Sequence, residues 1–171
     1  MFLRESWRVP MWTGAAALLA LPAVAMQFSK EISWGLEDFL IVGILLAAVC
    51  GTIELASRIS TNGLYRAGVA LAAAGGFTLV FINLAVGIIG DEQNPRNLVF
   101  LAIPVLGFIG ALIARFKAAA LVRLLIGMAA VQFFAMFLAP ADMMRLMIPF
   151  TGIFVGLWLA CALLIQRSTR A

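Results

Sequence analysis

Six long apolar stretches limit what this chain can fold into more than any other feature. They cover approximately residues 10–28, 39–57, 66–89, 97–114, 118–138 and 147–165. A helix needs about 20 apolar residues to cross the hydrocarbon core of a bilayer. No stretch alternates polar and apolar residues, as a membrane β-strand would. With 64% hydrophobic and 12% charged residues, the chain is far more apolar than soluble domains, which hold about 45–50% and about 25%. The sequence therefore predicts an all-α polytopic membrane helix bundle, one transmembrane domain over residues 1–171.

The charged residues predict how this bundle is oriented. Eight basic residues lie on one side of the six stretches (Arg4, Arg8, Arg58, Arg66, Arg115, Lys117, Arg167 and Arg170), and three lie on the other (Lys30, Arg96 and Arg145). Cytoplasmic loops carry the excess of Lys and Arg. Both termini are therefore expected in the cytoplasm. The outer side has three basic and six acidic residues, a net charge of −3.

The first apolar stretch is open to two interpretations. A basic leader, an apolar segment and the A-x-A pattern at 23–25 are typical of a cleavable signal peptide. Against cleavage, the apolar character continues through Met26 and Phe28. We expect residues 1–25 to remain as part of the first helix, while cleavage would leave five spans.

Small residues recur every fourth position in three of the predicted helices. The three sets are Gly43, Ala47 and Gly51; Gly68, Ala72 and Gly76; and Gly152, Gly156 and Ala160. Such stripes let helix backbones approach closely in lipid. They predict that the second, third and sixth helices form a tight core.

Polar residues inside the apolar stretches are the first candidates for function, because such groups are costly in hydrocarbon. Glu54 can pair with Arg58 one helical turn away, or with Arg123 on the fifth helix as a proton or ion relay. Arg123 can otherwise extend to the inner surface. Three amides, Gln27, Asn83 and Gln132, fall toward the outer side. They predict either a polar vestibule or hydrogen bonds between helices.

The polar segment between the third and fourth apolar stretches reads GDEQNPRN, residues 90–97. Gly90 is expected to end the third helix in a left-handed cap. Asn94 and Pro95 form an N-cap and first helical position for the fourth helix, with 96–97 facing headgroups and water. Asp91 and Glu92 are then candidates for an external contact with a cation or a partner.

Residue types that are missing exclude several kinds of chemistry. The chain has no histidine, which excludes imidazole ligands to metals and general-base catalysis by histidine. Its two cysteines stand in apolar stretches, and no P-loop, nucleophile elbow or metal-binding motif occurs. We expect no cofactor or metal. The scattered basic residues give no nucleic-acid signature.

Two stretches resemble a known group of proteins. The segments NLAVGIIGDEQNPRN (residues 83–97) and WTGAAALLALPAVAMQF (residues 12–28) are similar to small proteobacterial inner-membrane proteins of unassigned function. The resemblance implies a multi-pass protein of the bacterial inner (plasma) membrane. It implies no activity, substrate or catalytic residue.

Two functions fit these observations better than an enzyme, for which no nucleophile and base can be named. The first is movement of a small solute or ion across the membrane, supported by six helices and an acidic outer face that would concentrate cations. The second is an accessory or assembly subunit of a larger membrane complex. Expected partners are the lipid bilayer and either a second copy of the chain or a complex subunit.

Overall fold

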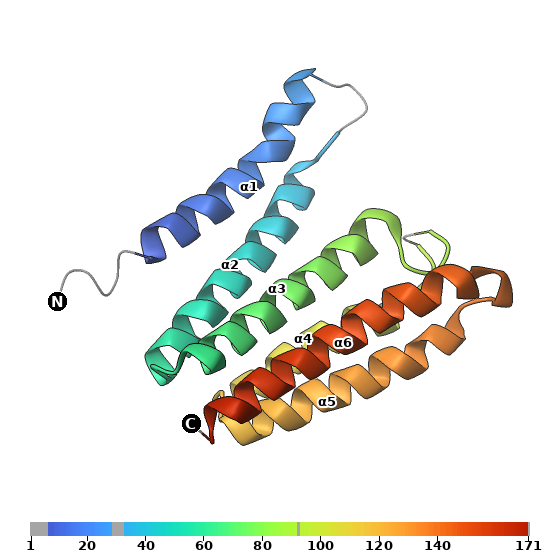
Figure 1. Ribbon diagram of the computed structural model, residues 1–171. Helices are drawn as coiled ribbons and strands as arrows, with labels where there is room; N and C mark the ends of the chain where they lie inside the picture. Colours follow the sequence, from blue (N-terminus) through green and yellow to red (C-terminus); the bar gives the residue numbers. More distant parts are fainter. Residues whose placement is uncertain (1–6, 29–32, 92, 171) are drawn as a thin grey trace. The chain divides into compact units, whose positions relative to one another are not determined.

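The computed structural model describes residues 7–28, 33–91 and 93–170. The described part contains six helices long and apolar enough to cross a membrane, and it contains no β-strand (Figure 1). They are α1 (Arg8–Phe28), α2 (Leu36–Ile59), α3 (Gly63–Val86), α4 (Leu98–Ile113), α5 (Ala118–Ala135) and α6 (Met144–Ser168). Short 3-10 turns, η2 (Pro95–Asn97), η3 (Met136–Leu138) and η4 (Ala141–Met143), extend α4, α5 and α6. The predicted all-α fold with six membrane-spanning helices is confirmed.

Helix α3 begins and ends three residues earlier than the predicted range, 66–89. The side chain of Asn62 caps the first turn by accepting from the backbone N–H groups of Leu64 and Tyr65. At the other end Gly87 takes a φ of 71° and its N–H bonds to the carbonyl of Asn83. A positive φ is accessible to glycine at little cost, which ends the helix here. The prediction that Gly90 caps this helix is wrong, although Gly90 also has a positive φ, 73°, in the following loop.

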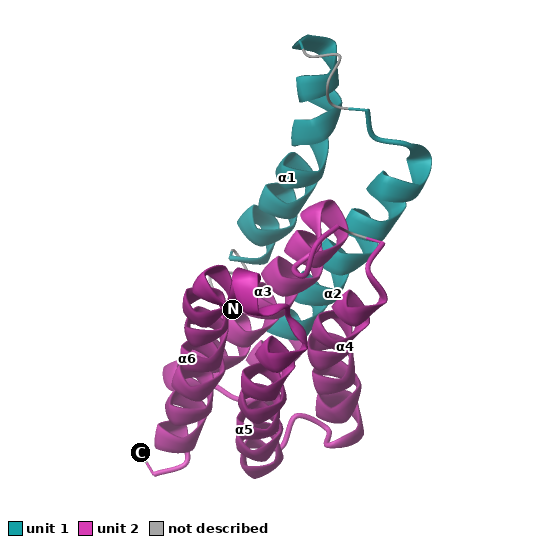
Figure 2. Ribbon diagram, turned by 90° about the vertical axis from the view of Figure 1, so that its right-hand side faces the viewer, with its two compact units in different colours: residues 1–54 teal, residues 55–171 magenta. Residues whose placement is uncertain are grey.

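Contacts divide the chain into two compact units, residues 1–54 and residues 55–171 (Figure 2). Unit 1 contains α1 and most of α2. In this unit a Cβ atom on Gly43 would lie 3.5 Å from Leu19, an ordinary packing distance. An ion pair joins Arg8 of α1 to Glu54 of α2 at 3.6 Å. The prediction of one transmembrane domain over the whole chain stays a prediction.

Unit 2 contains the last turn of α2 and helices α3 to α6. Helix α6 packs along both α3 and α5, and α4 packs against the same two helices. Aromatic rings follow the buried face of α6, with ring centroids 6.4 Å apart for Phe100–Phe150, 5.0 Å for Phe150–Phe154 and 6.2 Å for Phe154–Trp158. Trp158 and Phe100 are fully buried. The interior of unit 2 is thus a packed apolar and aromatic core.

The small-residue stripe of α3 brings that helix against α6 and α4. A Cβ atom on Gly68 would lie 2.7 Å from Ile165 and 3.1 Å from the carbonyl oxygen of Cys161, and one on Gly76 would lie 3.3 Å from Pro104. The stripe of α6 is different. Gly152 and Gly156 are exposed and have no neighbour within 4 Å of such a Cβ position. Helix α6 therefore meets α3 through another face, and the predicted use of its small stripe in this contact is wrong.

Two connections in unit 2 are held by side-chain bonds to backbone carbonyls. Arg66 donates to the carbonyls of Ser60 and Ser57 at 2.7 and 2.8 Å, and so ties the start of α3 to the end of α2. Between α4 and α5, Arg115 and Phe116 take positive φ values of 51° and 54°. The hydroxyl of Tyr65 donates to the carbonyl of Phe116 at 2.6 Å and fixes this unusual turn.

Substitution of one glycine on each stripe tests this packing. We expect Gly68→Ala to lower the free energy of unfolding by about 1–3 kcal/mol, because the added methyl group forces α3 away from the backbone of α6. Gly156→Ala is the matched control and should leave stability unchanged or raise it, since its methyl group meets no neighbour. Thermal unfolding in mild detergent measures both, and equal midpoints for the two variants would contradict the described contact.

Candidate functional site

The loop between α3 and α4 is organised by one buried side chain, Asn97, which is 4% exposed. Its Oδ1 accepts from the backbone N–H groups of Ile88 and Ile89 at 3.1 and 2.8 Å. Its Nδ2 donates to the carbonyls of Ile89 and Asp91 at 3.4 and 2.6 Å. Its own carbonyl accepts from Nδ2 of Asn83 at 2.7 Å. Asn97 therefore supplies the backbone bonds that the loop lacks after α3 ends at Val86.

The hydrogen bonds of this loop test the predictions made for residues 90–97, GDEQNPRN. Asn94 accepts from the N–H of Arg96 with Pro95 in the first turn, so the predicted start of the fourth span is confirmed. The prediction that Asn97 faces headgroups and water is wrong, because the side chain turns inward to the loop. Arg96 is exposed, and its Nη1 donates to the carbonyl of Leu138 at 3.1 Å.

Of the two candidate carboxylates of this loop, the structure describes Asp91. Asp91 is exposed, and its Oδ1 accepts from the N–H of Gln93 at 3.2 Å, which closes a tight turn. Glu92 lies outside the described residues. Among the residues that are described, no three His, Cys, Asp or Glu side chains come together as a metal site would require. An external contact at Asp91 and Glu92 stays a prediction.

Glu54 has a partner that the sequence did not suggest. It pairs with Arg8, and the two side chains are 20% and 25% exposed. Arg123 is exposed on α5 in unit 2, where its Nε donates to the carbonyl of Ala119 one turn earlier. This geometry fits the alternative in which Arg123 extends toward the membrane surface. The predicted Glu54–Arg123 pair would join the two units and stays a prediction.

The three amides divide between the units. Gln27 is exposed in the last turn of α1 in unit 1. Asn83 and Gln132 are buried in unit 2, at 5% and 0% exposure. Asn83 forms the hydrogen bond between helices that the sequence allowed, through Asn97. The predicted vestibule of all three amides spans both units and stays a prediction.

Gln132 lies in the core of unit 2 without a hydrogen bond. Both its Oε1 and its Nε2 are buried and lack a partner within the described part of the chain. The same holds for the hydroxyl of Thr151 on α6, at 2% exposure, and for Nε1 of Trp158. Buried polar groups are nearly always bonded to protein or water. Four unpartnered polar atoms in one packed core are therefore the least explained feature of unit 2.

The helix bounds place Gln132 and Thr151 near the same depth. Gln132 lies three residues before the end of α5, and Thr151 seven residues after the start of the antiparallel α6. With a rise of about 1.5 Å per residue, their levels differ by about one helical turn. Trp158 lies two turns further along the face of α6 that carries Thr151. We call these three residues the unpartnered polar set.

Neither Thr151 nor Trp158 stood out from the sequence. Threonine and tryptophan are common in membrane helices, and only the burial of their polar atoms sets them apart. Gln132 stood out because an amide interrupts an apolar run. Every side chain of the described chain that is more than nine-tenths buried is uncharged. The interior of unit 2 thus offers neutral donors and acceptors.

No family model, curated protein or solved structure matches the chain. The resemblance to small proteobacterial inner-membrane proteins stays a prediction.

Removal of the Asn97 side chain tests its role in the loop. We expect Asn97→Ala to lower the free energy of unfolding by about 2–4 kcal/mol, because each buried N–H left unpaired costs about 1–3 kcal/mol. Hydrogen exchange should accelerate at the amides of Ile88 and Ile89. Asn94→Ala is the control, since it removes one exposed capping bond and should leave those two amides protected. Unchanged protection in Asn97→Ala would contradict the assignment.

Proposed function

We propose that this multi-pass membrane protein moves a small, uncharged, polar solute across the bilayer through unit 2. The observation that carries the proposal is the unpartnered polar set of Gln132, Thr151 and Trp158 in a core that must lie within the membrane. Unsatisfied polar groups in hydrocarbon cost several kcal/mol each. A bound solute with hydroxyl or amide groups would form hydrogen bonds with these atoms and remove that cost. Binding of such a solute would therefore explain why the core contains these polar groups.

The polar atoms of this set support a neutral polar solute. The amide of Gln132 offers two donors and one acceptor, the hydroxyl of Thr151 offers one donor and an acceptor, and the indole of Trp158 offers one donor. None carries a charge that could balance an ion. The set therefore suits a neutral molecule with alternating donors and acceptors better than a proton or a metal cation.

The direction of movement follows the buried face of α6. Thr151 and Trp158 are seven residues apart on this face, and Phe154 lies between them at 5% exposure. The tilted rings of Phe154 and Trp158, with centroids 6.2 Å apart, fill this buried face in the described conformation. Movement of the solute therefore requires these rings to separate from α3 and α5.

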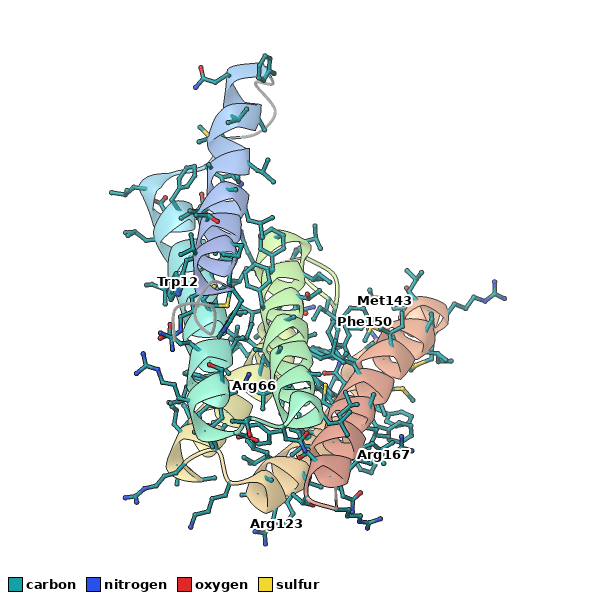
Figure 3. The ribbon with its side chains drawn as sticks, turned by 60° about the vertical axis from the view of Figure 1, so that its left-hand side comes forward. Trp12, Arg66, Arg123, Met143, Phe150 and Arg167 are labelled. Atoms are coloured by element: carbon teal, nitrogen blue, oxygen red, sulfur yellow. The ribbon has the colours of Figure 1, made fainter. Side chains whose placement is uncertain are left out.

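Location and orientation complete the proposal. We place the protein in the inner (plasma) membrane of a bacterium, as the sequence resemblance implies, with both termini in the cytoplasm. Within unit 2, Arg123 and Arg167 lie at one end and Met143 lies at the other (Figure 3). The end with more basic residues would face the cytoplasm.

An accessory or assembly subunit is the second candidate. It is favoured by the open stripe of α6, Gly152 and Gly156, which is exposed and contacts nothing within 4 Å. Small residues on an open face allow a helix of another subunit or a second copy to approach closely. Isolation of a stoichiometric partner from mild detergent would support this role over independent transport.

Transport through the unpartnered polar set predicts opposite effects on flux and stability. In proteoliposomes, Gln132→Leu and Thr151→Val should each reduce the uptake of neutral solutes such as glycerol or urea by about tenfold, as loss of a hydrogen bond of about 1.4 kcal/mol would. Both variants should match or exceed the parent protein in thermal stability, because each removes a buried group without a partner.

The matched control is Gln166→Leu, which changes an exposed glutamine near the end of α6. It should leave both flux and stability unchanged. Solute flux that persists in Gln132→Leu and Thr151→Val would refute the route. Lowered stability of both variants without a change in flux would assign the set a structural role instead.

A further inference from the structure

A groove of about 700 Å³ runs between α4 and α5 on the outside of unit 2. Its walls come from residues 99–114 and 120–131, and nearly all of its surface is apolar. Gly107, Gly110, Gly127, Met128 and Val131 contribute to the walls, and Arg123 is the charged residue at one end. We call this the α4–α5 groove. It is separate from the unpartnered polar set, which lies in the core.

Glycines shape this groove in two ways. Gly107 and Gly110 let α4 approach the side chains of α5, since their Cβ atoms would lie 2.5 Å from Met128 and 2.8 Å from Leu124. Gly127 acts differently, because no atom lies within 4 Å of its Cβ position. The missing side chain at Gly127 therefore leaves open space in the groove.

Charge is concentrated at one end of the groove. Arg123 is exposed, and its one hydrogen bond among the described residues uses Nε, so both Nη atoms are available to a ligand. Arg115 and Lys117 are exposed in the adjoining connection between α4 and α5. Residues 93–141 contain no Asp or Glu that could neutralise them. This end of the groove is therefore cationic.

The depth of Arg123 suits a lipid headgroup. It lies five residues after the start of α5, or about 7.5 Å along the helix, within reach of the membrane surface for a long side chain. Gly127 and Val131 follow at intervals of four on the same face of α5. They continue the groove for about 12 Å toward the centre of the bilayer.

We infer that the α4–α5 groove binds one anionic phospholipid, with its phosphate at Arg123 and one acyl chain along Gly127 and Val131. The apolar length matches part of an acyl chain, and the cationic end matches an anionic headgroup. A second copy is a poorer occupant. A two-fold contact through this groove, with its axis along the membrane normal, would place the cationic ends of both copies at the same depth on one interface, where the two Arg123 side chains would repel.

Lipid retention tests the headgroup contact. The full-length protein in mild detergent is mixed with equal amounts of dioleoylphosphatidylglycerol and dioleoylphosphatidylcholine, and native mass spectrometry counts the lipids that remain bound. Arg123→Gln should lower the ratio of retained phosphatidylglycerol to phosphatidylcholine about fivefold, the ratio that corresponds to about 1 kcal/mol for one cation at the membrane surface. Arg145→Gln, an exposed arginine outside the groove, should leave the ratio unchanged.

Filling the groove tests the acyl-chain contact. Gly127→Leu should abolish preferential retention of phosphatidylglycerol, because the new side chain occupies the open space. Gly152→Leu is the matched control and should retain the preference for phosphatidylglycerol. Gly152 is also open and exposed, but it lies on α6 outside the groove. In the absence of added lipid, Gly127→Leu should unfold at the same temperature as the parent protein or at a higher one, because the new Cβ atom meets no neighbour and leucine favours a helix more than glycine does.

Three results would overturn the inference. The first is an unchanged lipid ratio in Arg123→Gln. The second is full retention of phosphatidylglycerol in Gly127→Leu. The third is a dimer that forms without anionic lipid and dissociates in Gly127→Leu, which would assign the groove to a second copy of the chain.

Discussion

The hydrocarbon core of a membrane contains no water to satisfy polar groups, and the rest of this structure depends on that constraint. Helices satisfy most backbone groups internally, which explains six helices from six apolar runs. Where α3 ends at Val86, Asn97 supplies bonds to the N–H groups of Ile88 and Ile89. The hydroxyl of Tyr65 does the same for the carbonyl of Phe116. In both places, a polar side chain of unit 2 pairs with backbone groups that lie beyond the regular hydrogen bonds of a helix.

The fold was predictable because hydropathy and length suffice to identify spans. The bounds of α3 were less predictable, since Ile88 and Ile89 continue the apolar run after the helix has ended at Val86. Both are buried in the loop, so hydropathy gives no signal at the true end. The Arg8–Glu54 pair joins residues far apart in the sequence, and no spacing rule predicts it. The prediction that Asn97 faces water fails because Asn97 stands at the edge of an apolar run, where short-range patterns cannot distinguish a cap from a buried side chain.

Asn97 and Gln132 show why burial alone does not identify a functional amide. Both are buried in unit 2, yet the side chain of Asn97 makes four hydrogen bonds and that of Gln132 makes none within the described chain. Asn97 is accounted for by the loop that it holds. Gln132 has no such structural explanation, and the proposed solute route therefore includes Gln132 and Thr151 rather than Asn83.

Helix α5 presents two different surfaces, and this separates the two proposals physically. Gln132 and Leu125 face the core, whereas Arg123, Gly127 and Val131 face outward along the α4–α5 groove. Adjacent residues of a helix point about 100° apart, so a change on one surface need not disturb the other. A lipid in the groove would contact α4 and α5, while the route for solute follows α6. Lipid binding in the groove and solute movement along α6 can therefore be tested independently, although α5 contributes residues to both sites.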